Sequence, residues 1–455
     1  MAGIFKAYDV RGVYPDELDE TTAYQIGLAF RSVLIEGDFE HGKQVVAGRD
    51  MRLHSVSLHD ALKEGLRDSG LDVVDIGLTT TPMNYFAVGH FRTAGGVQVT
   101  ASHNPARYNG FKFSRSNAQP VSGEAGIPAI ESHVVQGDLK ANAERGDLET
   151  RSVAEAYRDH LLSTLEEVPG NRRLKVVIDA ANGMGCIYRP LLEAAGRAAL
   201  LDLDLLYFDL DGTFPNHEAN PLKLENLRDL CTRVVEVGAD LGVCFDGDAD
   251  RAAFVDQKGH PVSSDLTTAL IAGRLLGRDP GSAIVYDLRS SRTVREFITE
   301  CGGVPIRERV GHSFIKATLR RHSGIFGGEL AGHYYFRDNF YADCALMAVF
   351  EIVNLLRSSG NSLSELVAPL QRYAKSPEIN FEVDDKEAVM AQLAKEFSNG
   401  EIDYLDGITV QYHDWWFNVR PSNTEPLLRL VLEASTEQSL EQKQAKLFEY
   451  LGDPV

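Results

Sequence analysis

Short apolar runs alternate with amphipathic stretches along most of the chain, up to about residue 360. The apolar runs have the length of buried strands, and the stretches between them have the spacing of helices with one apolar face. Strands that alternate with helices in this way are typical of domains built around mixed or parallel sheets. The pattern therefore predicts an α/β protein.

Three of the predicted strands end alike. The runs 45–50, 176–183 and 284–290 each pass from β-branched residues into a polar turn that precedes a helix. They recur about every 110 to 130 residues, and a regular spacing of similar segments indicates a repeated unit. We expect one α/β domain with a mixed sheet to occur three times.

Each expected copy has a second strand, at 96–100, 241–245 and 323–327, that ends in an unusual loop. Ligands bind α/β sheets in the crevice beyond the carboxyl ends of strands. Three such loops could face one central cleft.

Polar, charged stretches at 136–150 and 372–378 are typical of linkers, and the chain after them differs in pattern. We therefore predict four domains: three similar α/β domains and a smaller C-terminal α+β domain. Their expected ranges are 1–147, 148–251, 252–368 and 369–455.

Composition and charge narrow the possible partners. Of the 455 residues, 46 are Lys or Arg and 66 are Asp or Glu, a formal charge of −20 that would repel nucleic acid and anionic membranes. No apolar run approaches the roughly 20 residues of a membrane helix, and the N-terminus lacks a secretory signal. The five cysteines form no CxxC pair, so neither a disulfide framework nor a zinc site is indicated. We expect a cytoplasmic protein that binds neither nucleic acid nor membrane.

The first motif with chemical meaning is Thr-Ala-Ser-His-Asn-Pro at 100–105, followed by Lys112. A serine between a strand and a Pro-terminated loop can present its hydroxyl at a cleft, and a nearby lysine can compensate the charge of an attached phosphate. The alternative is an ordinary turn in which Ser102 and Asn104 bond their own backbone.

The second motif places Asp246, Asp248 and Asp250 at alternate positions after an apolar strand, with Arg251 directly behind. Three carboxylates so arranged can converge on one hard cation that takes oxygen ligands. A solvated acidic turn is the alternative, although like charges without a cation repel one another.

The third motif is Arg-Pro-Ser-Asn-Thr-Glu-Pro at 420–426, with Arg429 close behind. A guanidinium beside a turn rich in hydroxyl, amide and backbone N–H groups can hold a phosphate. Three further segments, 8–12, 311–316 and 328–333, contain Arg11, His312 and His333. Without other evidence, an arginine or histidine in such a segment is more often a structural residue than a functional one.

Taken together, these loops resemble those of the α-D-phosphohexomutase superfamily, and most closely its bacterial phosphomannomutase/phosphoglucomutase group. The resemblance runs from Tyr8 to Thr424, and the phosphoserine, metal, sugar and phosphate loops follow the family's order and spacing. It implies a heart-shaped molecule of four domains, each contributing one loop to a central cleft.

The resemblance also implies the residue roles. Ser102 would carry the phosphoryl group and complete the protein's part of a Mg²⁺ site made by Asp246, Asp248 and Asp250. The other expected catalytic residues are His103, Lys112, Arg251, Arg11 and His312. The expected substrate-binding residues are Tyr8, Arg289, Glu329, His333, Arg420, Ser422, Asn423 and Thr424. We assign the general base to His312, since a neutral imidazole titrates near physiological pH.

The implied reaction is an isomerisation. Phosphorylated Ser102 would give its phosphoryl group to the free hydroxyl of mannose or glucose phosphate, which forms a hexose 1,6-bisphosphate. This intermediate would turn end for end, and Ser102 would take back the other phosphoryl group. Mg²⁺ and the bisphosphate are the expected cofactors, and the expected assembly is a monomer or homodimer. We expect the C-terminal domain to close the cleft and exclude water.

Two positions depart from the family pattern. Arg289 stands where a lysine is usual, which favours an electrostatic role over proton transfer, and Ala331 stands where many members have a serine. A phosphoglucosamine mutase, a Mg²⁺-dependent sugar-phosphate phosphatase and a non-catalytic sugar-phosphate sensor are the alternatives.

Overall fold

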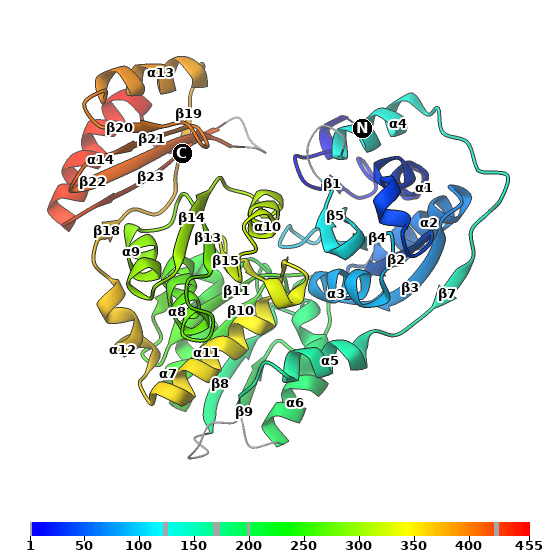
Figure 1. The fold of residues 1–455 in the computed structure, drawn as a ribbon, viewed down its shortest axis with the longest axis horizontal. Helices are drawn as coiled ribbons and strands as arrows, with labels where there is room; N and C mark the ends of the chain where they lie inside the picture. Colours follow the sequence, from blue (N-terminus) through cyan, green and yellow to red (C-terminus); the bar gives the residue numbers. More distant parts are fainter. Residues whose placement is uncertain (1, 122–125, 167–172, 198–200, 423–426) are drawn as a thin grey trace.

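The computed structural model of the protein describes residues 2–121, 126–166, 173–197, 201–422 and 427–455. Within these residues the strands form four sheets, which follow one another along the chain. Figure 1 shows the first domain, in blue and cyan, and the last domain, in orange and red, on opposite sides of the molecule, with the second and third domains between and below them. The expected architecture of three α/β domains and a smaller C-terminal domain is confirmed.

The first sheet has the strand order β1-β5-β4-β2-β3-β7, with β6 beside β5. Its strands are β1 Val10–Val13, β2 Gln44–Arg49, β3 Asp72–Leu78, β4 Gly95–Val99, β5 Tyr108–Arg115, β6 Gln119–Pro120 and β7 Leu148–Thr150. Its helices are α1 Glu20–Phe30, α2 Ser55–Asp68, α3 Thr81–Phe91 and α4 Ile127–Gln136. The side chain of Thr80 caps α3 by accepting from the Met83 N–H, and Pro82 stands at the start of the helix, where a missing N–H costs nothing.

The second sheet has the order β12-β11-β10-β8-β9. Its strands are β8 Leu174–Asp179, β9 Leu201–Leu206, β10 Leu241–Phe245, β11 Ala252–Asp256 and β12 Pro261–Val262. The helices of this domain are α5 Ala154–Leu162, α6 Arg189–Arg197 and α7 Arg228–Val237.

The third sheet has the order β14-β13-β15-β16-β17. Its strands are β13 Ala283–Asp287, β14 Val304–Glu308, β15 Phe326–Gly328, β16 Tyr334–Phe336 and β17 Ala342–Asp343. The helices are α8 Ser264–Leu276, α9 Arg292–Glu300, α10 His312–Arg321, α11 Ala345–Ser359 and α12 Leu363–Val367.

The three α/β sheets share one topology. In each, a central strand (β2, β8 or β13) runs parallel to both of its neighbours, and the next strand outward from β4, β10 or β15 is antiparallel. The central strands are buried over most of their length, as expected for parallel strands covered by helices on both faces. This shared order supports the repeat expected from the sequence.

The fourth sheet is antiparallel, with the order β18-β23-β22-β21-β20 and β19 beside β23. Its strands are β18 Ala374–Lys375, β19 Ile379–Glu382, β20 Glu401–Asp403, β21 Ile408–Gln411, β22 Trp415–Pro421 and β23 Leu427–Ala434. Its helices are α13 Lys386–Glu396 and α14 Glu437–Leu451.

Two domain boundaries lie further along the chain than expected. β7 falls within the stretch 136–150 that we expected to be a linker, yet it pairs with β3 of the first sheet. β11 pairs with β10, so a boundary after residue 251 would divide the second sheet. Both strands belong to the sheet that precedes them in the chain. β11 runs antiparallel to β10 directly after the aspartate loop. Neither the polarity of the sequence nor the motif shows that the sheet continues beyond these points.

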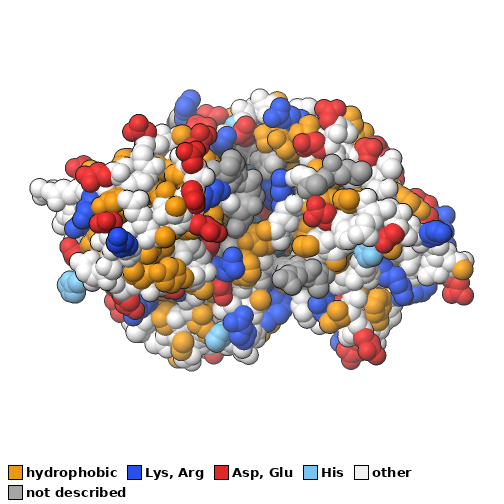
Figure 2. Space-filling model, turned by 90° about the horizontal axis from the view of Figure 1, so that it is seen from above, with side chains coloured by type: hydrophobic (Ala, Val, Ile, Leu, Met, Phe, Trp, Pro, Cys, Tyr) orange, Lys and Arg blue, Asp and Glu red, His pale blue; other side chains and the backbone are white. Residues whose placement is uncertain are grey.

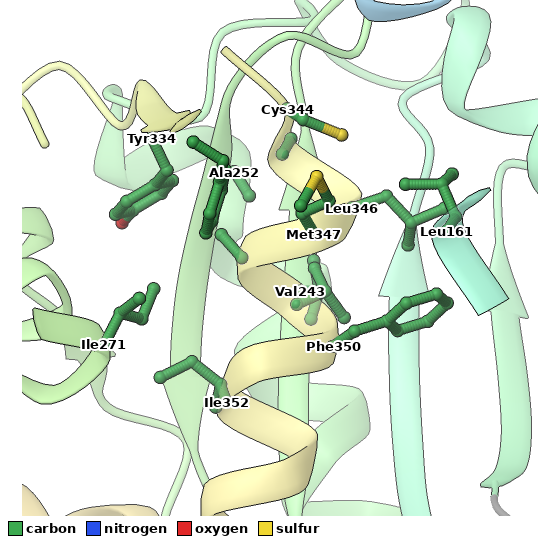
Figure 3. Close-up of a cluster of buried hydrophobic side chains, with 14 of the residues drawn as sticks. Leu161, Val243, Ala252, Ile271, Tyr334, Cys344, Leu346, Met347, Phe350 and Ile352 are labelled. Carbon is green, nitrogen blue, oxygen red and sulfur yellow. The ribbon is translucent and has the colours of Figure 1, made fainter. Parts of the chain in front are cut away.

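The hydrophobic cores show which domains are joined. One continuous cluster of buried residues includes side chains of the second and third domains and also of the first domain, among them Met83, Phe86 and Val88 of α3, and a separate cluster fills the C-terminal domain. In Figure 3, Met347 and Phe350 of α11 lie close to Val243 of β10 and Leu161 of α5. The second and third domains therefore form one packed body, and α3 with β2 and β3 of the first domain packs onto it. Among the described residues, none of the helices combines the length and hydropathy that a bilayer crossing requires.

Candidate active site

Three loops that follow equivalent strands meet in space. Ser102 follows β4, Asp246 follows β10 and Glu329 follows β15. The Ser102 hydroxyl donates to Asp246 Oδ2 at 2.9 Å, and Arg251 and His333 form an isolated antiparallel bridge between their loops. The carboxyl ends of these three strands thus build one site from three domains, as α/β sheets commonly do.

Ser102 is held in an unusual backbone conformation. Its φ is +52°, in the left-handed region, which costs a non-glycine residue about 1 kcal/mol or more. Its N–H donates to Thr100 Oγ1 at 3.0 Å, and Arg251 donates to its hydroxyl oxygen at 3.1 Å. Arg251 also contacts Nδ1 of His103. In this conformation the Ser102 hydroxyl contacts both Asp246 of the aspartate loop and the guanidinium of Arg251.

Arg52 is a residue of this site that the sequence did not reveal. Its side chain is buried and forms an ion pair with Asp50 at 3.2 Å. Its two terminal nitrogens donate to four backbone carbonyls of the serine loop, those of Ser102 (2.8 Å), Asn104 (2.6 Å), Pro105 (2.9 Å) and Tyr108 (3.1 Å). The only available signal was the polar turn after β2, which does not show where the arginine points.

Arg11 reaches the same loop from the other side. Its NH1 donates to Asn104 Oδ1 at 2.8 Å, and its Nε donates to Asp9 Oδ2 at 2.8 Å. It therefore lies beside the serine loop.

Asp246, Asp248 and Asp250 are buried, and each offers a carboxylate oxygen within 4.8 Å of the others. Lys112 Nζ lies 2.7 Å from Asp248 Oδ2 and also contacts Asp250. Asp248 Oδ1 and Asp250 Oδ1 are buried and have no hydrogen-bond partner in the described part of the chain. Buried acceptors without donors are costly, so these oxygens fit a hard cation such as Mg²⁺.

The charges in this loop are strongly coupled. Burial and the two neighbouring carboxylates raise the pKa of Asp246 well above its usual value. Burial acts in the same direction on Asp248, but the Lys112 ammonium outweighs it and lowers the pKa of that carboxyl. Asp248 and Asp250 in turn hold the pKa of Lys112 well above its usual value, against the effect of burial. Lys112 therefore stays protonated and neutralises part of the acidic cluster.

Close approach of the two loops depends on Gly247. A Cβ at this position would lie 2.3 Å from the carbonyl oxygen of Ser102. Only glycine allows the backbones to come this near without displacing one of them.

The loop after β15 supplies Glu329 and His333. Glu329 is buried, accepts from the Tyr335 hydroxyl, and lies 4.0 Å from an Arg289 nitrogen. Burial raises the pKa of Glu329. His333 Nδ1 lies 2.9 Å from Asp343 Oδ2, so the imidazole is oriented by a carboxylate.

His312 opens α10, and its ring centroid lies 5.4 Å from that of Tyr8 and 6.4 Å from that of His333. Its Nδ1 is buried without a hydrogen-bond partner in the described ranges. Burial, followed by the Lys316 ammonium, lowers the pKa of His312 well below its usual value. The imidazole is therefore neutral near pH 7, but it is a weaker base than a free imidazole, contrary to the expectation that it titrates near physiological pH.

A second group of charges forms around Glu378. Its carboxylate contacts Arg420 at 2.7 Å, Arg429 at 3.1 Å and Arg289 at 3.5 Å. Arg289 also pairs with Asp287 at 2.6 Å. These two carboxylates, with Glu329, hold the pKa of Arg289 above its usual value despite burial.

Most of the expected residues thus fall into two connected groups. One surrounds Ser102 and the three aspartates, and the other surrounds Glu378, with the Arg289–Glu329 approach between them. The Ser422 N–H donates to the Leu427 carbonyl at 2.8 Å, and Asn423 and Thr424 lie outside the described residues. Seen from above, the surface is hollowed near the middle, with Lys and Arg side chains along the hollow (Figure 2).

Comparisons with known proteins bear on the fold and on the family. Family models of phosphoglucomutase/phosphomannomutase match residues 2–141 (alpha/beta/alpha domain I), 155–259 (domain II), 263–373 (domain III) and 378–449 (C-terminal domain). A protein of Xanthomonas campestris named "Phosphohexose mutases" is 40% identical over 96% of both chains. A phosphomannomutase of Salmonella typhimurium is 38% identical over 94% of both chains.

A solved structure shows the same fold. The crystal structure of a phosphoglucomutase/phosphomannomutase family protein from Burkholderia thailandensis has a TM-score of 0.89 and is 33% identical, over 99% of this chain and 97% of that one. With the four family models in their expected order and relatives matched over nearly their full length, the chain belongs to the phosphoglucomutase/phosphomannomutase family of isomerases.

Proposed function

We propose that the protein moves a phosphoryl group reversibly between the 1- and 6-positions of mannose or glucose phosphate, through phosphorylated Ser102 and a hexose 1,6-bisphosphate. The observation that carries this proposal is the position of the Ser102 hydroxyl, 2.9 Å from Asp246 of the aspartate loop and 3.1 Å from Arg251. A phosphoryl group on this oxygen would lie where cationic groups can stabilise it. The names of the relatives support a hexose phosphate as substrate.

Asp246, Asp248 and Asp250 would hold Mg²⁺, with an oxygen of the Ser102 phosphate as a further ligand. When bound, the metal ion would neutralise charge on the transferring phosphoryl oxygens. Arg251 and Lys112 stand beside Ser102 and the aspartates and would share this task, since phosphoryl transfer asks a protein mainly for positioning and charge stabilisation.

The transfer needs one base and one acid. The free hydroxyl of the substrate attacks the phosphorus atom, a new P–O bond forms and the bond to Ser102 Oγ breaks. The hydroxyl proton passes to neutral His312, and Ser102 Oγ takes a proton from solvent as it leaves as an alcohol; in the reverse step both proton transfers run backwards. The bisphosphate then turns, and the reverse steps return the other phosphoryl group to Ser102.

Glu329 and His333 would bind the sugar hydroxyls, with Tyr8 at the same end of the site. Arg289 and Arg420 would hold the phosphate that does not react, together with Ser422 and with Asn423 and Thr424. Arg289 is paired with Asp287 and keeps its proton, so its part is electrostatic.

The test is conversion of mannose 1-phosphate or glucose 1-phosphate to the 6-phosphate, with Mg²⁺ and a trace of glucose 1,6-bisphosphate, followed by phosphorus NMR. We expect isomerisation by the wild type and none by Ser102→Ala. Glucosamine 1-phosphate is the third substrate to run. Release of inorganic phosphate without isomerisation would instead identify a phosphatase.

A further inference from the structure

Glu378 contacts Arg289 and Arg420, to which we assign the distal phosphate, and the neighbouring Arg429. Its Oε2 lies 2.7 Å from Arg420 NH2 and 3.5 Å from Arg289 NH1, and its Oε1 lies 3.1 Å from Arg429 NH1. The side chain is 23% exposed. Against the effect of burial, the three guanidinium groups lower the pKa of Glu378 to about 2. A permanent negative charge therefore sits among three positive ones.

A carboxylate and a phosphate bind arginine in the same way, by accepting N–H hydrogen bonds with charged oxygens. Glu378 leaves part of this capacity unused, because Nε of Arg289 and Nε of Arg420 are buried and have no partner in the described segments. Arg289 is 7% exposed and Arg420 is 2% exposed, so water does not readily reach these groups. A phosphate offers more oxygens than a carboxylate and could satisfy donors that Glu378 does not.

We propose that Glu378 is an internal ligand of the phosphate-binding arginines, which the distal phosphate of the substrate must displace. The proposal rests on the function proposed above for these arginines. Glu378 keeps the guanidinium groups together and partly neutralised while the site holds no phosphate. It also lowers the apparent affinity for anions, because only molecules with Glu378 displaced can bind them.

The displacement also bears on how the domains are joined. Arg289 follows β13 of the third domain, whereas Glu378 immediately precedes β19 of the C-terminal domain and Arg429 lies within β23. The contact between Arg289 and Glu378 therefore ties the two domains together. When a phosphate displaces Glu378, the contact between Arg289 and Glu378 is lost, and the phosphate connects the arginines of the two domains instead. Binding of the substrate and the position of the C-terminal domain therefore become linked.

The experiment measures binding of inorganic phosphate by calorimetry, without Mg²⁺, to the full chain and to Glu378→Gln. Glutamine keeps the size of the side chain and removes its charge. We expect phosphate to bind on the order of tenfold more tightly to the variant, because the competing carboxylate is gone. Arg420→Ala, combined with Glu378→Gln, should abolish the gain. Since phosphate binding needs no turnover, the result stands apart from the outcome of the mutase assay.

The matched control is Glu441→Gln, which removes the same charge from an exposed position on α14. A similar gain in this control would mean that overall charge, not displacement, sets the affinity, and it would overturn the proposal. Equal or weaker binding by Glu378→Gln would also overturn it, since Glu378 would then only position the arginines. Near-UV circular dichroism checks that each variant folds. If Glu378→Gln does not fold, Glu378→Asp takes its place. Aspartate keeps the charge on a shorter side chain, so the gain in phosphate affinity over the wild type should be smaller.

Discussion

Arg52 shows how one buried side chain can set the position of a reactive group. It makes no contact with the Ser102 hydroxyl in the described structure, but it donates to the carbonyls of Ser102 and Asn104 and spans the turn between them. An ion pair with Asp50 fixes the guanidinium itself. Every residue has a backbone carbonyl, so a side chain that binds carbonyls does not require particular residues in the loop. Such a contact therefore cannot be predicted from a sequence motif in that loop.

We expect Arg52→Lys to lower kcat about 100-fold with little change in KM, since a shift of about 1 Å in a reacting group can cost that much. Lysine keeps the charge beside Asp50 but cannot reach four carbonyls from a planar fork. Steady-state kinetics, with a thermal unfolding curve for each variant, would measure this. Arg67→Lys in α2, where Arg67 binds the Gly146 carbonyl, is the control. An unchanged kcat, or a loss explained by unfolding, would contradict the positioning role.

The reactive loops could be predicted from the sequence because each combines an apolar strand with a compact polar motif. Ser102 and the three aspartates are separated in sequence, but both motifs follow strands that occupy the same place in repeated domains. Glu378 could not be predicted in this way. Its partners lie 42, 51 and 89 positions away, and the polar stretch around it was interpreted as a linker. Contacts between distant side chains depend on how domains pack, which local patterns do not contain.

A contact between α2 and β3 predicts how the first domain responds to acid. His59 of α2 is buried 3.6 Å from Asp75 of β3, and burial lowers its pKa to about 4 from 6.5. Between these values the unfolded chain binds a proton that the folded chain does not. Stability from this group is therefore complete above pH 6.5 and is lost as the pH falls toward 4, by about 3 kcal/mol in all.

Thermal unfolding of the wild type and of His59→Gln, at several pH values from 7 to 4.5, would test this. We expect the midpoint of the wild type to fall more steeply with decreasing pH than that of the variant, because glutamine does not titrate. His41→Gln changes an exposed histidine and should keep the wild-type slope. Parallel slopes for the wild type and His59→Gln would show that His59 does not take up a proton on unfolding.

At the scale of the whole molecule, packing divides the chain into unequal parts. The second and third domains share one core, to which α3 of the first domain also contributes, whereas the C-terminal domain has its own. The connecting stretch 372–378 is not a free tether. Arg372 at its start pairs with Glu296 and Glu300 of α9, and Glu378 at its end binds Arg289. Polar side chains, not an apolar interface, therefore hold much of this junction, which is the kind of contact that can be exchanged during a domain motion.

Arg292 of α9 makes a further polar contact between the third and C-terminal domains, and it provides a test of domain closure. Its guanidinium donates to the carbonyls of His413 and Trp415 at 3.0 and 3.1 Å and also contacts that of Tyr412, all in the C-terminal domain. We expect glucose 1,6-bisphosphate to reduce the radius of gyration of the wild type in X-ray scattering, because the phosphate joins arginines of both domains. Arg292→Ala should broaden the distance distribution of the unliganded protein, since the hinge loses three hydrogen bonds, and the ligand should still contract it. Superimposable profiles with and without ligand would mean that the C-terminal domain already stands in its closed position, and the exclusion of water from phosphorylated Ser102 would then have to come from the loops alone.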